Sequence, residues 1–235
     1  MTQKLVYDGL QRCPYLPGRV ARMPLYRQMR RLTLDEADVR FANAERRVGT
    51  CLYRTACPTC QACEGIRVPV ADFRPSKSQR RVRNRWKDHG RVEVGPVTFS
   101  AEKLAMFNRH KHERDLVSDD DGEMSPMGYA SWLVHSCVHT VEMRYYFEDA
   151  LVGVGVVDLG RESASSVYFY FDPDFSHLSP GVFSALEEIS LCQRTGRRYL
   201  YLGLYVEDCR QLAYKASYRP HERLVDGDWR RVDDG

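Results

Sequence analysis

The side-chain pattern between residues 139 and 171 constrains the fold more than any other part of the sequence. Apolar and aromatic residues alternate with other residues over about 139–147, 151–159 and 166–171, and short turns separate these runs. Alternation bounded by turns is typical of strands, and three strands joined by short turns pair as an antiparallel meander. This region therefore predicts the central sheet of an α+β protein.

Helices are predicted on either side of the meander. The hydroxyl of Ser100 can cap a helix that runs to about residue 116, and residues 127–136 form a second helix. Ser179 and Pro180 mark a third helix start, because the hydroxyl can accept from free amides and proline gives up a donor that has no partner. A strand over 199–206, a short helix over 209–216 and a hairpin through 226–227 are expected to follow. This order resembles the GNAT acyltransferase fold, an analogy that concerns the fold alone.

The chain of 235 residues is long enough for one large domain or two small ones. Cysteine, proline and arginine are concentrated before about residue 95, whereas aromatic and β-branched residues dominate after about 139. We therefore divide the chain into residues 1–95 and 96–235. No Ser/Gly linker and no internal repeat separates them, which predicts an N-terminal cysteine-containing α+β subdomain packed against a GNAT-like acyltransferase core.

The overall charge and hydropathy narrow the possible surroundings. Lys and Arg number 35 against 32 Asp and Glu, a net charge of +3, so contact with nucleic acid must come from local clusters. No apolar run approaches the roughly 20 residues of a membrane span, and the N-terminus lacks the apolar stretch of a signal peptide. We expect a cytoplasmic protein without membrane contact, whose eight cysteines are thiols or metal ligands rather than disulfides.

Three cysteines, Cys57, Cys60 and Cys63, have the spacing of a metal-binding knuckle. Thiolates at this spacing suit zinc or an iron–sulfur cluster, and Cys13 or Cys51 could complete a set of four. Cys13 is favoured because Cys51 lies in a strand-like run and can face the core. The alternative is a group of buried or reactive thiols, since no second Cys-x-x-Cys pair closes the site. The cysteines expected in the apolar core are Cys137, Cys192 and Cys209.

A strongly basic helix is predicted over 77–88. Its cations are Lys77, Arg80, Arg81, Arg83, Arg85 and Lys87. On a helix they occupy two adjacent faces, and no carboxylate intervenes to neutralise them. A site for phosphate or carboxylate groups is favoured, and a solvated basic face is the alternative.

The strand predicted over 199–206 carries a glycine at an unusual place. Tyrosine and leucine alternate along it, which first of all indicates a half-buried strand. Gly203 suggests a splay or a close backbone approach, and in acyltransferases of this shape such a gap admits the acyl group. Tyr214 and Lys215 follow on the next predicted helix, near the same edge.

The chain lacks the phosphate loop of coenzyme-A-dependent GNAT enzymes. That loop reads Arg or Gln, then x-x-Gly-x-Gly or Ala, and its free amides bind pyrophosphate at a helix N-terminus. The corresponding residues 172–181 hold one glycine, two prolines and two aspartates, which remove donors and repel phosphate. The acyl donor is therefore predicted not to be coenzyme A. An aminoacyl-tRNA ester would fit, because its phosphates lie far from the acyl group.

Longer motifs resemble one protein family. The N-terminal ones are Cys13-Pro-Tyr-Leu-Pro-Gly-Arg19, Tyr53-Arg54, the three spaced cysteines, and the segment from Arg67 to Arg81 that contains Ser-Lys-Ser-Gln-Arg-Arg. The C-terminal ones are Tyr170-Phe-Asp-Pro173, Leu202-Gly203, Cys209 and the segment from Tyr214 to Pro220. Together they resemble the aminoacyl-tRNA–protein transferases, that is, the arginyltransferase family and its bacterial aspartate/glutamate leucyltransferase branch.

The resemblance implies an aminoacyltransferase of the N-end rule. It implies transfer of an amino acid from aminoacyl-tRNA to the N-terminal amine of proteins that begin with Asp or Glu, which creates an N-degron for downstream degradation machinery. Leucine is the implied cargo, and arginine is the alternative because residues 204–208 and 211–212 depart from the branch's usual residues. More remote alternatives are an atypical GNAT acetyltransferase and a non-catalytic tRNA-binding or metal-sensing module.

The expected site residues fall into four groups. The catalytic group is Tyr201, Gly203, Tyr214 and Lys215. The backbone of 201–204 is expected to receive the amine and Tyr214 to relay a proton to the leaving oxygen, while Lys215 and one of Arg80 or Arg81 hold the acceptor carboxylate or a tRNA phosphate. The substrate-binding group is Arg67, Lys77, Arg80 and Arg81. The tRNA-binding group is Arg83, Arg85 and Lys87, and the metal group is Cys13, Cys57, Cys60 and Cys63. An α-amine with a pKa of roughly 7.7 to 8.0 is already partly neutral at pH 7, so the chemistry is expected to require no cofactor.

Overall fold

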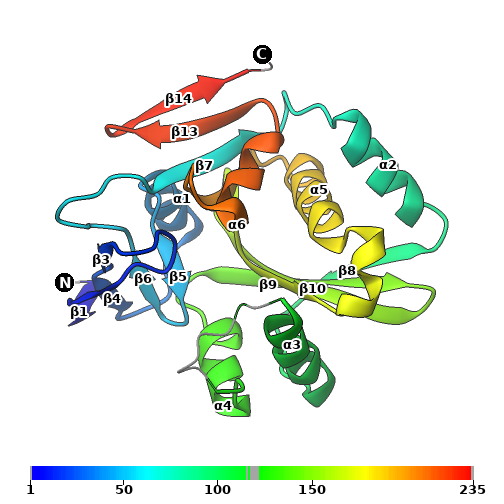
Figure 1. Ribbon diagram of the computed structural model, residues 1–235, viewed down its shortest axis with the longest axis horizontal. Coiled ribbons are helices and arrows are strands. Elements are labelled where there is room, and N and C mark those ends of the chain that lie inside the picture. The colour runs from blue at the N-terminus through cyan, green and yellow to red at the C-terminus, as the bar shows by residue number, and fades with distance from the viewer. Residues whose placement is uncertain (1, 115, 117–121, 234–235) are drawn as a thin grey trace.

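The computed structural model describes residues 2–114, 116 and 122–233, and it shows an α+β fold around one large sheet (Figure 1). The large sheet has eight strands in the order β14-β13-β7-β12-β11-β10-β9-β8. Their bounds are β7 Glu64–Pro69, β8 Gly90–Gly95, β9 His139–Phe147, β10 Ala150–Leu159, β11 Ser163–Phe171, β12 Tyr199–Tyr205, β13 His221–Val225 and β14 Asp228–Val232. Neighbouring strands pair antiparallel, except β11 and β12, which pair parallel. The predicted α+β class and the antiparallel meander of β9, β10 and β11 are confirmed.

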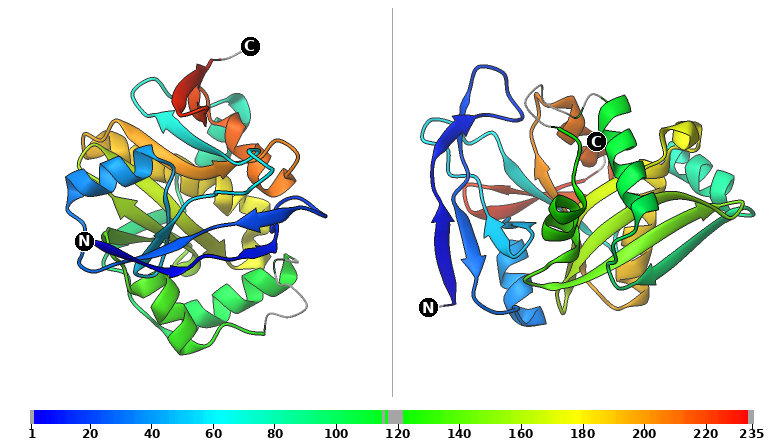
Figure 2. Two further views of the ribbon diagram at one scale, coloured as in Figure 1. Left: turned by 90° about the vertical axis from the view of Figure 1, so that its left-hand side faces the viewer. Right: turned by 90° about the horizontal axis from the view of Figure 1, so that it is seen from below.

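Residues 3–53 form two smaller sheets and one helix at one end of the molecule (Figure 2). One sheet has the order β1-β4-β6-β5, and β2 pairs with β3 in a ribbon. The bounds are β1 Gln3–Tyr7, β2 Leu10–Arg12, β3 Val20–Arg22, β4 Leu25–Gln28, α1 Leu34–Ala42, β5 Arg46–Val48 and β6 Cys51–Tyr53. Helix α1 begins with a capping box, in which the Thr33 hydroxyl accepts from the Glu36 amide and the Glu36 carboxylate accepts from the Thr33 amide.

Helices cover both faces of the large sheet. Helices α2 (Lys77–Trp86) and α5 (Pro180–Arg194) pack on one face, where the rings of Trp86 and Phe183 stack with centroids 4.2 Å apart. Helix α3 (Ala101–Glu113) and helix α4 (Pro126–Tyr129), which continues as a π-helix over Ala130–Val134, pack on the other. A 3₁₀ turn over Pro173–Leu178 precedes α5, and α6 (Arg210–Ala213) runs into a 3₁₀ turn over Tyr214–Ser217.

Most predicted helices and strands after residue 64 are present. Ser100 caps α3 as predicted, with its hydroxyl accepting from the Lys103 amide at 3.2 Å. The predicted hydroxyl cap of Ser179 is wrong: this residue has a left-handed backbone with φ 56°, and its side chain makes no capping hydrogen bond. Pro180 nevertheless occupies the first turn of α5 as expected.

The two parts predicted on either side of residue 95 share the large sheet. Strand β7 lies between β13 and β12, and β8 forms the opposite edge beside β9, although both strands precede residue 96. A buried ion pair also joins the smaller sheet to the large one. Arg47 of β5 donates from Nε to both Asp158 oxygens, at 3.0 and 2.8 Å, and both side chains are 1% exposed.

Among the described residues, no helix has the length and apolar character needed to cross a membrane.

Candidate functional site

Strands β11 and β12 separate after a short parallel pairing. They pair only from Ser163 to Ser165 on β11 and from Tyr199 to Tyr201 on β12. Beyond that point β12 continues to pair with β7, where the register shifts between Tyr201 and Gly203. Gly203 has φ 91°, a conformation that side chains disfavour, so glycine permits this bulge. The splay that the sequence predicted at Gly203 is therefore present.

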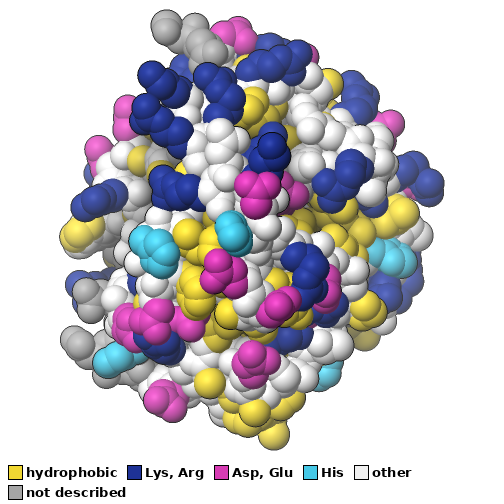
Figure 3. Space-filling model, turned by 90° about the vertical axis from the view of Figure 1, so that its right-hand side faces the viewer, with side chains coloured by type: hydrophobic (Ala, Val, Ile, Leu, Met, Phe, Trp, Pro, Cys, Tyr) yellow, Lys and Arg dark blue, Asp and Glu magenta, His cyan; other side chains and the backbone are white. Residues whose placement is uncertain are grey.

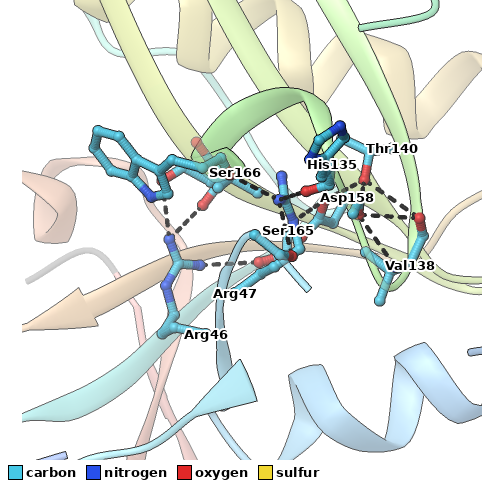
Figure 4. A network of polar contacts seen from close by, with 12 residues as sticks. Arg46, Arg47, His135, Val138, Thr140, Asp158, Ser165 and Ser166 are labelled. Atoms are coloured by element: carbon cyan, nitrogen blue, oxygen red, sulfur yellow. Dashed lines mark hydrogen bonds and ion pairs between the residues drawn. The ribbon is translucent and has the colours of Figure 1, made fainter. Parts of the chain in front are cut away.

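Arg46 of β5 fills the opening between the two strands (Figure 4). Its guanidinium donates from Nη1 to the Ser165 hydroxyl at 2.9 Å and from Nη2 to the Ser166 carbonyl at 2.6 Å. A side chain at position 203 would place its Cβ 2.8 Å from the Arg46 guanidinium carbon. Gly203 is thus required both for the backbone turn and for the space that Arg46 occupies.

Two consecutive arginines have different electrostatic surroundings in this region. Arg47 is neutralised by Asp158, and the Thr140 hydroxyl completes that carboxylate's contacts at 2.7 Å (Figure 4). Arg46 is half-buried and donates only to neutral oxygens; no ion pair found in the described ranges includes it. A cation without a carboxylate partner therefore faces the opening.

Lys215 brings a second cationic group to the same place. Its Nζ donates to the Leu204 carbonyl at 2.8 Å, directly after Gly203 on β12. Burial, and then the charge of Arg46, lower the pKa of Lys215 to about 7. The neighbouring Tyr214 is 54% exposed as a whole residue, but burial around its hydroxyl, and then the charge of Glu188, raise the pKa of that group. These two predicted residues lie beside the splay.

Glu188 of α5 is the acidic group of the site. It is 1% exposed, and burial raises its pKa to about 7 against the opposing effects of two serine hydroxyls and Arg46. The hydroxyls of Ser166 and Ser184 both donate to Oε1 at 3.4 Å, whereas Oε2 has no described partner. The buried Tyr218 hydroxyl also lacks a described partner. Burial raises the pKa of Tyr218, and the nearby charge of Glu188 raises it further. Ser166 therefore connects the two charged groups: the Ser166 carbonyl accepts from Arg46, and the Ser166 hydroxyl donates to Glu188.

Arg67 and Tyr201 are engaged with each other away from Glu188. Arg67 donates from Nε to Glu222 at 2.6 Å and from Nη1 to the Tyr201 hydroxyl at 3.0 Å. Its guanidinium also lies between the rings of Tyr199 and Trp229, 3.9 and 4.2 Å from their centroids. The Tyr201 side chain packs in a separate core cluster with residues of α1, so only its backbone borders the splay.

The basic helix forms as predicted, and most of its cations face solvent. Ser76 caps α2 in a capping box with Gln79, and Gln79, Val82 and Trp86 are its buried residues. The Gln79 amide donates to the Ser217 carbonyl at 3.2 Å, which brings the start of α2 beside the Tyr214–Ser217 turn. The exposed cations are Lys77, Arg80, Arg81, Arg85 and Lys87, and Arg83 is half-buried.

No described ion pair neutralises any of these six cations. Two of them bind carbonyls instead: Arg80 donates to Pro75 and Arg85 donates to His177, each at 2.6 Å. The charge of Arg83 lowers the pKa of Glu187 on α5, where burial has the larger, opposite effect. Figure 3 shows Lys and Arg side chains gathering on the upper part of the face that carries α2.

The four predicted metal ligands lie in one neighbourhood. Burial raises the pKa of Cys63 to about 12, and the nearby thiols of Cys57, Cys13 and Cys60 raise it further. Cys51 lies elsewhere, buried in β6, and the predicted core cysteines 137, 192 and 209 are also buried. The soft donor set suits zinc or an iron–sulfur cluster, but within the described ranges no three His, Cys, Asp or Glu side chains converge on a metal-binding geometry.

The cysteine neighbourhood supports the end of β12. Cys13, Cys60 and Cys63 pack with Tyr15 and Leu16 against Val206, Cys209 and Leu212, which lead from β12 into α6. A cleft of about 530 Å³ opens beside them, between residues 54–65 and the β13–β14 turn at 224–227, and Leu204 forms part of its wall. The cysteines therefore lie close to the segment that carries Tyr214 and Lys215.

Two residues of the site were not predicted from the sequence. Glu188 has a local signal, because it follows Ser184 by four residues within the apolar stripe of α5, where a carboxylate is out of place. Arg46 has no comparable signal, because Arg46 and Arg47 are adjacent in a polar segment and nothing local distinguishes them. Only the tertiary structure shows that one is neutralised and the other is not.

Comparison with known proteins identifies the family. The arginine-tRNA-protein transferase N-terminus model matches residues 11–81, and the C-terminus model of the same transferase matches residues 102–225. An aspartate/glutamate leucyltransferase of Methylobacillus flagellatus is 36% identical over 80% of this chain and 75% of its own length. One from Vibrio cholerae is 32% identical over 93% of this chain and 92% of its own.

Among solved structures, L-PGS from Bacillus licheniformis aligns with 73% of this chain and 59% of its own length, at 13% identity and a TM-score of 0.49. The two family models together extend over most of the chain and include the splay, the cysteine knuckle and the first turn of α2. The chain therefore belongs to the arginine-tRNA-protein transferase family.

Proposed function

We propose that this protein transfers leucine from aminoacyl-tRNA to the N-terminal amine of proteins that begin with Asp or Glu. The observation that carries the proposal is the similarity, over most of the chain, to curated relatives that bear the name aspartate/glutamate leucyltransferase. Such a transfer would create an N-degron in the cytoplasm for downstream degradation machinery. Arginine is the second candidate donor, because both matching family models describe arginine-tRNA-protein transferases.

The large sheet with its splayed parallel pair is proposed to be a GNAT-like core. Its order of elements and the gap between β11 and β12 support this assignment. The turn before α5 supports a donor other than coenzyme A because Pro180 lacks an amide proton; the predicted repulsion by Asp172 and Asp174 is reduced, since Arg109 pairs with them at 2.8 and 2.6 Å. An ester whose phosphates lie at a distance from the acyl group meets no such obstacle.

The chemistry needs a neutral amine and a stabilised tetrahedral oxyanion. The amine attacks the ester carbonyl, the 3′-oxygen of the tRNA leaves with the bonding electrons, and the amine proton must pass to a base. Glu188, with its pKa near 7 and an unpartnered oxygen, is proposed to accept that proton. The backbone of Tyr201–Leu204 is proposed to receive the amine, and Tyr214 to protonate the leaving oxygen.

Helix α2 is proposed to hold the tRNA. Arg83, Arg85 and Lys87 would contact phosphates, and the exposed Lys77, Arg80 and Arg81 would do the same nearer the site. Exposed cations without carboxylate partners are available to an incoming phosphate without breaking an ion pair. The contact between Gln79 and Ser217 supports this arrangement, because it joins α2 to the turn that carries Lys215.

A transfer assay tests the proposal directly. The full chain is incubated with a pool of labelled aminoacyl-tRNAs and with peptides that begin with Asp, Glu, Asn or Ala. Labelled leucine should appear on the Asp and Glu peptides. Transfer of no amino acid to any acidic peptide would refute the function. Tight coenzyme A binding in calorimetry without binding of charged tRNA would instead favour an acetyltransferase, and tRNA binding without turnover would favour a non-catalytic module.

A further inference from the structure

Two cationic side chains, from β5 and from the turn after α6, contact adjacent residues of β12 at the splay. The guanidinium of Arg46 lies against Gly203, and the Nζ of Lys215 binds the carbonyl of the next residue, Leu204. The charge of Arg46 acts on Lys215, which shows that the two groups are within electrostatic range. Neither takes part in an ion pair within the described ranges. The carboxylate of Glu188 lies within electrostatic range of Arg46, but its described hydrogen bonds go to Ser166 and Ser184, so neither cation has a direct carboxylate partner.

Such an arrangement costs free energy unless an anion joins it. Cations withdrawn from water are normally matched by a carboxylate. Arg47, the residue next to Arg46 in the sequence, is matched in this way by Asp158. Arg46 uses three of its donors on the Ser165 hydroxyl and on the carbonyls of Ser166 and Val167. Of its five N–H groups, two remain for a ligand. These contacts hold the guanidinium in place, so a carboxylate would meet an already oriented donor.

Under the proposed function, on which this inference rests, the acceptor protein itself supplies a suitable anion. A first residue Asp or Glu carries a carboxylate only a few bonds from the amine that must reach the splay. The cations predicted to bind substrate are less suited to this role. Arg67 is already paired with Glu222, and Lys77, Arg80 and Arg81 lie on the exposed surface of α2. We infer that Arg46, together with Lys215, binds the side-chain carboxylate of the acceptor's first residue and determines the preference for Asp and Glu.

The test measures discrimination between charged and neutral acceptors. Initial rates are compared for two peptides that differ only in Asp or Asn as the first residue, with saturating leucyl-tRNA. The unaltered protein should prefer the Asp peptide by about thirtyfold, the order expected for an unmatched ionic hydrogen bond. Arg46→Gln should lower the Asp rate by more than tenfold and the Asn rate by less than about threefold. Arg46→Lys should keep part of the preference, because it keeps the charge but loses the fork geometry.

Matched variants separate this role from general damage. Arg27→Gln removes an exposed arginine from β4 of the same small sheet and should leave both rates unchanged. Lys215→Met removes the second cation and should by itself reduce the Asp-to-Asn ratio, so the inference stays testable if Arg46→Gln does not fold. Equal loss of both rates, with the ratio preserved in Arg46→Gln or in Lys215→Met, would overturn the inference. That result would leave the proposed function intact, whereas absence of transfer from the unaltered protein would refute the function itself.

Discussion

Replacing Glu188 by glutamine should stabilise the protein at neutral and alkaline pH. The carboxylate is buried in α5, and glutamine preserves its shape together with the oxygen that accepts from Ser166 and Ser184. Burial raises the pKa of Glu188 from 4.5 to about 7. The folded state therefore retains a proton that the unfolded chain has already lost between these pH values. Stability attributable to this group is present below pH 4.5 and is lost as the pH rises to about 7.

The magnitude follows from the size of the pKa change. At about 1.4 kcal/mol per pKa unit, the ionised carboxylate costs about 3 kcal/mol of folding free energy above pH 7. Glutamine does not ionise and avoids this cost. The stability difference between the Glu188→Gln variant and the unaltered protein should therefore grow by about 2.5 kcal/mol between pH 5 and pH 8.

Urea denaturation at several pH values measures this difference, because the titration of all other groups cancels between the two proteins. Glu207→Gln serves as the matched control, since it makes the same carboxylate-to-amide change at an exposed position after β12. If the unfolding free energies of the Glu188→Gln variant and of the unaltered protein change in parallel from pH 5 to pH 8, Glu188 is not a buried carboxylate with a raised pKa. That result would also remove the basis for its proposed role as a base.

Three further predictions concern the tRNA, the cysteines and the donor. Changing Arg83, Arg85 and Lys87 to alanine should weaken tRNA binding and reduce the slope of its salt dependence by up to about three, and an unchanged slope would indicate a merely solvated helix face. Protein purified anaerobically should carry about one zinc ion or iron–sulfur cluster, and Cys60→Ser should lose both the metal and transfer activity; full activity in metal-free protein would contradict this. Leucine should be transferred in preference to arginine, as the similarity to relatives named aspartate/glutamate leucyltransferase indicates. A preference for arginyl-tRNA that Glu207→Gln abolishes would reverse that assignment.

The large sheet could be predicted because its elements carry local signals. Alternation marks β9 and β10, Ser100 marks the start of α3, and Gly203 marks the splay at the bulge of β12. These features depend on sequence neighbours, which a single chain displays directly. Helix α1 also carries a local signal, the Thr-x-x-Glu capping box at Thr33 and Glu36, although no helix was predicted there.

The residues missed at the site depend on contacts between distant segments. Arg46 reaches Ser165 across 119 positions, and no local pattern indicates such a contact. The placement of β7 between β12 and β13 is equally non-local, since residues 64–69 join strands that begin more than a hundred positions later. Motifs could therefore indicate the chemistry and the sheet, but not which cation enters the opening.

The position of Arg46 and Arg47 has a consequence for how this protein can be divided. A fragment that begins at Glu64 would contain every strand of the large sheet. It would nevertheless leave Asp158 as a buried charge without its partner, at a cost of about 3–5 kcal/mol, and it would leave the splay without its guanidinium. The N-terminal sheet therefore cannot be removed without loss, and grafting the large sheet alone onto another protein would transfer neither a stable scaffold nor the complete proposed site.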